Sequence, residues 1–146
     1  MRRMLSHADS RFACAGLSVL VIDDNHYLRD VVRVILEREG ATVLDAASVA
    51  QAQAVLERYV PDAVVTDLEV FPDVRGGVQM LDFVKRRYSS CPVVLLTGRS
   101  DTYEELCEIG FDEVVFKPAS TTVLIGAVLA AIRRYRSASK RETTAA

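Results

Sequence analysis

Short hydrophobic runs alternate with longer segments of helical periodicity along most of the chain. The first run, LSVLVI at residues 17–22, is rich in β-branched residues and is followed by apolar residues at helical spacing up to Gly40. These apolar residues are Leu28, Val31, Val32, Ile35 and Leu36. Short β-branched runs are typical of buried strands, and i, i+3, i+4 spacing is typical of amphipathic helices. The pattern therefore predicts a strand at 17–22 and a helix that stops at Gly40.

The same alternation repeats four more times. Strands are predicted at 41–46, 62–67, 92–98 and 113–118, and helices at 48–59, 78–88, 101–110 and 121–136. Ser48 is expected to cap the second helix, and Pro61 follows that helix. Parallel strands need crossover connections, which are usually helices. Five such units predict a single α/β domain with a doubly wound, five-stranded parallel sheet and five helices.

The two ends of the chain lack this alternation. Residues 1–16 show no periodicity and are interpreted as a flexible N-terminal extension. Residues 17–136 are interpreted as the domain, and residues 137–146, SASKRETTAA, as a polar C-terminal tail.

Composition narrows the class of protein. Half of the residues are hydrophobic and 26% are charged, which is ordinary for a globular domain. The net charge of −2 argues against direct nucleic-acid binding, which usually shows as a basic excess. The longest apolar run, residues 123–132, is too short to span a bilayer. Three cysteines without metal-ligand spacing indicate reduced thiols. We therefore expect a cytoplasmic protein without membrane insertion.

Polar residues stand at the ends of four predicted strands. They are Asp23 and Asp24, Asp67, Thr97 and Lys117. Open α/β sheets bind ligands beyond the carboxyl ends of their strands, so these residues are expected to meet at one edge of the sheet.

This set of side chains suits phosphoryl transfer. Three clustered carboxylates repel one another unless a cation neutralises them, and oxygen ligands suit Mg²⁺. Lys117 adds a positive charge and Thr97 a hydroxyl donor. Phosphoryl transfer depends mainly on positioning and charge stabilisation, and an aspartate can itself be the nucleophile.

Each residue also has a simpler interpretation. Asp24 or Asn25 could serve simply as the cap of the first helix, and Asp67 could be a turn residue. Thr97 could be an ordinary strand residue, and Lys117 could be a solvated loop residue. Together these interpretations require a coincidence at four strand ends, so the sequence favours a shared site.

The motifs at these positions resemble the receiver domain of two-component response regulators. They are VIDDN at 21–25, VVTDL at 64–68, LLTG at 95–98 and FKP at 116–118. The resemblance covers residues 17–136 and implies a flavodoxin-like sheet of order 2-1-3-4-5. The chain would be a stand-alone, single-domain regulator; its alternative is a part of a longer regulator that also carries an effector domain.

The resemblance also implies roles for the site residues. Asp67 would be the phosphoacceptor, and Mg²⁺ would be bound by Asp24 directly, Asp23 partly through water, Asp67, and the backbone carbonyl of Glu69. Thr97 and Lys117 would contact the phosphoryl oxygens, and the Lys117–Pro118 bond would be cis.

The implied partners are proteins. A histidine kinase or histidine phosphotransfer protein would supply the phosphoryl group, and a downstream protein partner would read the signal. The last helix is apolar nearly all round, which favours an interface for a homodimer or another partner. That interface would be formed by the helix at 101–110, the strand at 113–118 and the helix at 121–136. Its alternative is a small-residue helix tolerated on the surface.

Two alternative functions are considered. One is a receiver-like scaffold that acts without phosphorylation. The other is a phosphohydrolase of the haloacid dehalogenase type, which would need a second aspartate where this chain has Glu69.

Three departures from the receiver pattern bear on the signal. Val114 stands where an aromatic residue is usual, with Phe116 beside the lysine instead. The loop after Asp67, which contains Phe71 and Pro72, looks about two residues longer than usual. The segment between Thr97 and Lys117 looks about two residues shorter.

Overall fold

Five parallel strands form one sheet in the order β2-β1-β3-β4-β5. The computed structural model describes residues 12–98 and 103–145, with side chains through Ala138. The strands are β1 (Ser18–Ile22), β2 (Thr42–Ala46), β3 (Ala63–Thr66), β4 (Val93–Thr97) and β5 (Glu113–Phe116). The predicted parallel sheet and its order are confirmed.

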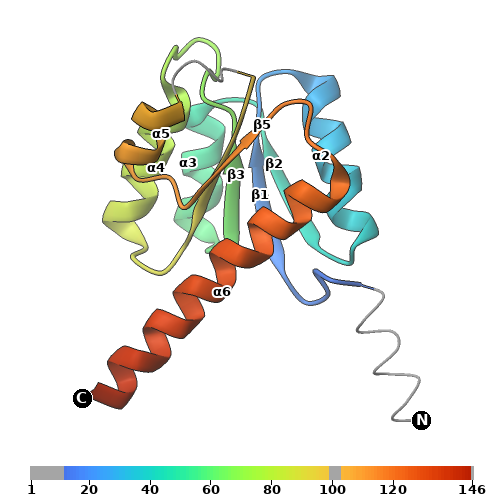
Figure 1. The fold of residues 1–146 in the computed structure, drawn as a ribbon. Coiled ribbons are helices and arrows are strands. Elements are labelled where there is room, and N and C mark those ends of the chain that lie inside the picture. The colour runs from blue at the N-terminus through green and yellow to red at the C-terminus, as the bar shows by residue number, and fades with distance from the viewer. Residues whose placement is uncertain (1–11, 99–102, 146) are drawn as a thin grey trace.

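Helices cover both faces of this sheet. In the described part of the chain they are α2 (His26–Arg38), α3 (Val49–Arg58), α4 (Gly76–Arg87), α5 (Tyr103–Ile109) and α6 (Thr121–Ala145). Helices α2 and α6 lie on one face, and α3, α4 and α5 lie on the other (Figure 1). No helix within the described residues has the length and hydropathy needed to cross a membrane.

The alternation of strand side chains explains the two layers. Val19 and Val21 of β1 pack with residues of α2 and α6, whereas Leu20 and Ile22 pack with residues of α3 and α4. All five residues of β1 are buried, which is why this strand reads as an unbroken hydrophobic run.

Side-chain caps start the first two helices close to the ends of β1 and β2. Asn25 accepts a hydrogen bond from the Leu28 N–H at 3.1 Å, and Ser48 accepts one from the Gln51 N–H at 3.1 Å. The predicted cap at Ser48 is confirmed, and at the first helix the cap is Asn25 rather than Asp24. Asp24 is therefore available for the site at the sheet edge.

The two ends of the domain differ from the sequence prediction. Helix α6 continues to Ala145, beyond its predicted end at Arg136, because residues 137–145 contain no glycine or proline to stop it. The backbone N–H of buried Cys14 donates to the carbonyl of Glu39 at 2.8 Å. Residues 12–16 of the predicted extension therefore pack against the end of α2, while residues 1–11 lie outside the described part.

Candidate functional site

The strand ends bring the predicted site residues to one edge of the sheet. Ile22 of β1 is in register with Thr66 of β3, and Thr97 of β4 is in register with Phe116 of β5. The backbone pairing continues one residue further, because Asp67 N donates to Ile22 O at 3.0 Å and Lys117 N donates to Thr97 O at 2.8 Å.

Three carboxylates and one ammonium group meet at this edge. Asp23, Asp24 and Asp67 each place a carboxylate oxygen within 4.8 Å of the others. Nζ of Lys117 lies 3.3 Å from Oδ2 of Asp23 and 3.3 Å from Oδ2 of Asp67. Asp23 is buried, Asp67 is 18% exposed at its side chain, and Asp24 is exposed. The structure thus joins four of the predicted residues in one cluster.

Backbone N–H groups orient the two less exposed carboxylates. Oδ1 of Asp23 accepts from the Asn25 N–H at 2.9 Å, and Oδ1 of Asp67 accepts from the Leu68 N–H at 2.8 Å. Each carboxylate therefore uses one oxygen on the adjacent backbone and turns the other toward Lys117.

The charge of Asp67 is incompletely compensated in this setting. Burial raises the pKa of the Asp67 carboxyl above its ordinary value; the nearby Lys117 ammonium opposes this rise and the Asp23 carboxylate adds to it. A further cation would favour the ionised form that a nucleophilic carboxylate requires.

The donor set fits Mg²⁺. Mg²⁺ takes oxygen ligands at about 2.0–2.1 Å in octahedral geometry, which places neighbouring ligands about 3 Å apart and opposite ligands about 4 Å apart. The three carboxylate oxygens lie within 4.8 Å of one another, so small side-chain adjustments would complete such a site. Asp24 has the greatest freedom to adjust because it is exposed.

Two further predicted site residues are Thr97 and Glu69. Thr97 is buried at the end of β4, and its carbonyl accepts the bond from Lys117 N described above. Glu69 is exposed, two residues after Asp67. The phosphoryl contact of Thr97 and the metal ligation by the Glu69 carbonyl stay predictions. The Lys117–Pro118 bond is cis, as the resemblance implies, and so is Phe71–Pro72.

Two residues near the cluster were not predicted from the sequence. Nη1 of Arg29 donates to the backbone carbonyl of Asp23 at 2.8 Å. A Cβ atom on Gly77 would lie 2.3 Å from the Asp67 carbonyl oxygen, so only glycine allows the start of α4 to pack here. The adjacent glycines after a turn-rich stretch could have signalled this close approach. For Arg29 the sequence gives no signal, because Arg33, one helical turn later, has the same residue type and the same helical setting.

The aromatic residue beside Lys117 has a ring partner. The rings of Phe116 and Tyr103 lie 5.3 Å apart between centroids, at an interplanar angle of 55°. Val114, at the position where an aromatic is usual, packs instead against the core on the α3, α4 and α5 side of the sheet. An aromatic contact between β5 and α5 therefore exists, displaced by two residues along the strand.

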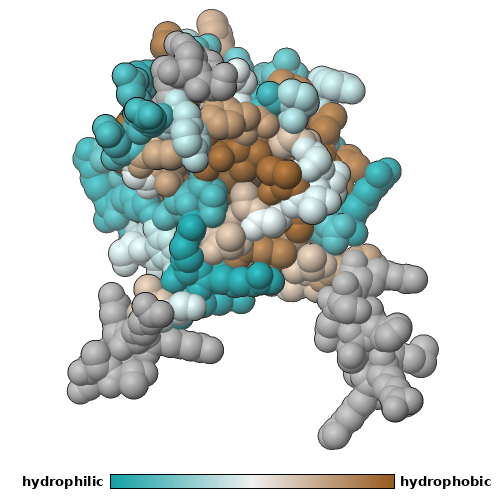
Figure 2. Space-filling view, viewed as in Figure 1, coloured by the Kyte–Doolittle hydropathy of each residue, from teal (hydrophilic) through white to brown (hydrophobic). Residues whose placement is uncertain are grey.

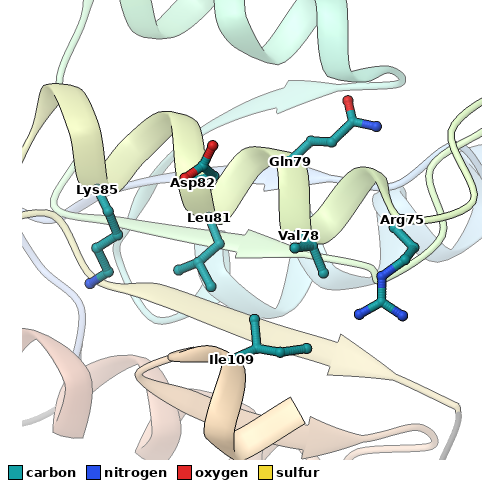
Figure 3. A pocket seen from close by; sticks show the side chains of 7 residues that line it. All are labelled: Arg75, Val78, Gln79, Leu81, Asp82, Lys85 and Ile109. Atoms are coloured by element: carbon teal, nitrogen blue, oxygen red, sulfur yellow. The ribbon is translucent and has the colours of Figure 1, made fainter. Parts of the chain in front are cut away.

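A groove of about 530 Å³ lies between α4 and α5. Val78, Leu81 and Ile109 point into it, with Arg75 and Lys85 at its two ends (Figure 3). It contains none of the strand-end residues, so the cluster at the sheet edge is the better candidate for the functional site.

The chain is similar in sequence to known proteins. Residues 19–129 match the model of the response regulator receiver domain. The chain is 30% identical over 123 residues to the phosphate regulon transcriptional regulatory protein PhoB of Pseudomonas aeruginosa. That match covers 82% of this chain and 53% of PhoB, so the chain spans about half the length of this relative.

The fold is also similar to solved structures of response regulators. A response regulator receiver domain protein from Clostridium thermocellum is similar with a TM-score of 0.73 and 28% identity, over 82% of this chain and 97% of that one. NtrX from Brucella abortus is similar with a TM-score of 0.78 and 27% identity, over 88% of this chain and 29% of that one.

Proposed function

The chain belongs to the response regulator receiver family, and we propose that it accepts a phosphoryl group on Asp67 in a Mg²⁺-dependent two-component phosphorelay in the cytoplasm. The observation that carries this proposal is the cluster of Asp23, Asp24 and Asp67, in which Asp23 and Asp67 pair with the Lys117 ammonium. The protein would catalyse only the transfer of the phosphoryl group to and from its own Asp67.

The chemistry follows from the arrangement of these groups. A carboxylate oxygen of Asp67 would bond to the phosphorus of a phosphohistidine, and the phosphorus–nitrogen bond would break with its electron pair left on the imidazole nitrogen. Lys117 and the hydroxyl of Thr97 would hold phosphoryl oxygens. Asp23, Asp24, Asp67 and the Glu69 carbonyl would hold Mg²⁺, which when bound would neutralise charge on the transferring group.

A groove beside Lys117 favours a protein, rather than a small molecule, as the phosphodonor. It measures about 380 Å³, is mainly apolar, and is lined by α2 and the segment that joins β5 to α6. Its residues include Leu28, Val31 and Pro118 as well as Lys117. A histidine kinase or histidine phosphotransfer protein bound in this groove would bring its phosphohistidine close to Asp67.

The exposed apolar side chains near α5 and α6 suit a readout through protein binding. Val123 is 55% exposed and Tyr103 is 48% exposed. Hydrophobic residues also gather in the middle of the face above α6 (Figure 2). We assign the downstream partner surface, or a homodimer contact, to α5, β5 and α6; sedimentation with and without phosphorylation would distinguish the two.

Intact mass spectrometry tests the proposed function directly. The protein is incubated with Mg²⁺ and acetyl phosphate, with Asp67→Asn as the control. We expect one phosphoryl adduct on the parent and none on the variant, and no adduct when Mg²⁺ is chelated.

The same measurement separates the alternative functions. A parent that gains no adduct and does not respond to beryllofluoride with Mg²⁺ would be a scaffold that acts without phosphorylation. Rapid turnover of many phosphoesters would instead indicate a phosphohydrolase.

A further inference from the structure

Arg29 is a largely enclosed charge next to the acidic cluster. Its side chain is 13% exposed, and its enclosed Nε has no hydrogen-bond partner among the described residues. The nearest carboxylate oxygen to Nε, Oδ2 of Asp45, is 3.6 Å away. Nη2 lies 3.2 Å from Nδ1 of the exposed His26. Enclosing a guanidinium is costly unless its N–H groups are well paired, so this placement calls for an explanation.

The short bond that Arg29 does make is to the backbone of the site. Its Nη1 donates at 2.8 Å to the carbonyl oxygen of Asp23, which belongs to the peptide bond between Asp23 and Asp24. On the other side of the same residue, Asp23 N donates to the Ala46 carbonyl at 3.2 Å. The backbone of Asp23 is therefore hydrogen-bonded to both β2 and α2. These two bonds fix the orientation of the peptide group between Asp23 and Asp24.

We propose that Arg29 is a positioning residue for the metal site, which holds the Asp23–Asp24 peptide so that both carboxylates are oriented for Mg²⁺. This inference rests on the proposed function. Arg29 acts through the Asp23 carbonyl and does not touch the phosphoryl group. Groups that orient metal ligands typically contribute tenfold or more to metal affinity.

A charge effect alone would have the opposite sign. A cation beside a metal site repels the metal, so a neutral residue at this position would bind Mg²⁺ more tightly if charge were all that mattered. Loss of positioning would make Mg²⁺ binding weaker. The direction of the change therefore separates the two roles.

Arg33 provides a matched control on the same helix. It lies one turn after Arg29, its Nε is 3.9 Å from the same Oδ2 of Asp45, and its Nη2 donates to Asp30 at 2.9 Å. Within the described residues, its ion pairs are with Asp30, Glu37 and Asp45, and none involves Asp23. Arg33→Gln thus removes an equal charge from the same face without disturbing the site peptide.

The experiment is a Mg²⁺ titration of the unphosphorylated full chain, followed by ¹H–¹⁵N NMR and repeated by calorimetry. The proteins are the parent, Arg29→Gln, Arg29→Lys and Arg33→Gln. We expect the dissociation constant of Mg²⁺ to rise about tenfold in Arg29→Gln, less in Arg29→Lys, and to stay within about twofold in Arg33→Gln. Thermal unfolding of each variant without Mg²⁺ reports any general loss of stability.

A kinetic measurement adds a second readout. With acetyl phosphate as donor, Arg29→Gln should need about tenfold more Mg²⁺ for half-maximal phosphorylation and then reach a rate close to that of the parent. A merely structural role would lower the unfolding temperature and leave the Mg²⁺ requirement unchanged.

Distinct results would overturn the inference and the function it rests on. Equal or tighter Mg²⁺ binding by folded Arg29→Gln, with normal binding by the parent, overturns the role of Arg29 alone. Failure of the parent to bind Mg²⁺ or to be phosphorylated on Asp67 overturns the proposed function as well. If Arg29→Gln does not fold, Arg29→Lys decides, since it keeps the positive charge but weakens the hydrogen bond to the Asp23 carbonyl. It must then weaken Mg²⁺ binding for the inference to stand.

Discussion

The ammonium nitrogen of Lys117 lies 3.3 Å from Oδ2 of Asp67. It is equally close to Oδ2 of Asp23, so in the absence of metal this lysine supplies the local counter-charge for both carboxylates. Lys117 faces the oxygens that would bind Mg²⁺, whereas Arg29 faces the backbone that carries them. Two cations near one site should therefore affect metal binding in opposite directions.

Replacing Lys117 by methionine should tighten Mg²⁺ binding and slow phosphorylation. Removal of a competing positive charge from the carboxylates should lower the dissociation constant about fivefold. Loss of a group that stabilises the transferring phosphoryl should cost about a hundredfold in the rate with acetyl phosphate. Calorimetry and intact mass measure the two quantities.

Lys85→Met is the control for that prediction. Lys85 pairs with Asp112 at 2.9 Å and belongs to neither the metal cluster nor its backbone supports. It should leave both Mg²⁺ affinity and phosphorylation rate near those of the parent. Weaker Mg²⁺ binding by Lys117→Met would contradict the assignment of Lys117 as a competing counter-charge.

Gly77→Ala should both destabilise the domain and disturb the site. The new Cβ would lie 2.3 Å from the Asp67 carbonyl oxygen and 2.9 Å from the Cα of Leu68, and both of these are backbone atoms. We expect a loss of about 1–3 kcal/mol in the free energy of unfolding, measured by urea denaturation. Mg²⁺ binding should weaken as well, because Asp67 must shift to relieve the overlap.

Gly126→Ala is the matched glycine. A Cβ at this position in α6 meets no described atom within 4 Å. Alanine favours a helix interior over glycine, so this variant should gain about 0.5–1 kcal/mol in stability. A comparable loss at both glycines would show that the cost at Gly77 does not come from its contact with Asp67.

The sequence was sufficient to predict the sheet and the acidic cluster for related reasons. Hydrophobic runs bounded by helical segments predict the strands, and the parallel arrangement then brings the strand ends to one edge. Asp23 and Asp67 follow β1 and β3 directly, which are neighbours in the sheet. Their proximity therefore follows from the strand order alone, with no need to know any side-chain conformation.

The remaining features depend on tertiary contacts that periodicity does not specify. Arg29 and Arg33 have the same residue type and lie on the same helix, and only the packing of α2 over β1 shows which of them reaches the Asp23 carbonyl. The pairing of Phe116 with Tyr103 likewise depends on how α5 sits against β5. Helix α6 extends past its predicted end because the polar residues that follow Arg136 are compatible with a helix, and polarity alone does not distinguish a helix from a tail.

The raised pKa of Asp67 predicts a pH-dependent gain in stability for Asp67→Asn without Mg²⁺. Because the pKa of this carboxyl is higher in the folded state than in the unfolded chain, the folded state binds the proton more readily. The stability of the parent therefore falls as pH rises through these two pKa values and remains lower above them. At pH 7 in EDTA the variant should unfold at a higher temperature than the parent, and this difference should vanish well below pH 4.

Asp30→Asn should show the opposite pH dependence. A hydrogen bond from Arg33 lowers the pKa of the Asp30 carboxyl, so its ionised form stabilises the folded state. That contribution is present at neutral pH and is lost as pH falls through the lowered pKa. The variant should thus be less stable than the parent at pH 7 and equal to it in acid. The same sign for both variants would refute the assignment of a charge penalty to Asp67.

The ring contact between Tyr103 and Phe116 predicts an energetic coupling between α5 and β5 that responds to phosphorylation. Phe116 is in register with Thr97 and adjoins Lys117. A movement of either site residue toward a phosphoryl group would therefore displace the Phe116 ring. A double-mutant cycle with Tyr103→Ala and Phe116→Ala should give a coupling of about 0.5–1.5 kcal/mol in the free energy of unfolding. With beryllofluoride and Mg²⁺ that coupling should change, because the ring contact would be rearranged.

Tyr27→Ala combined with Phe116→Ala should be additive in both states, since Tyr27 lies at the start of α2 on the opposite layer of the sheet. A coupling that is identical with and without beryllofluoride would place signal transmission elsewhere than at this aromatic pair.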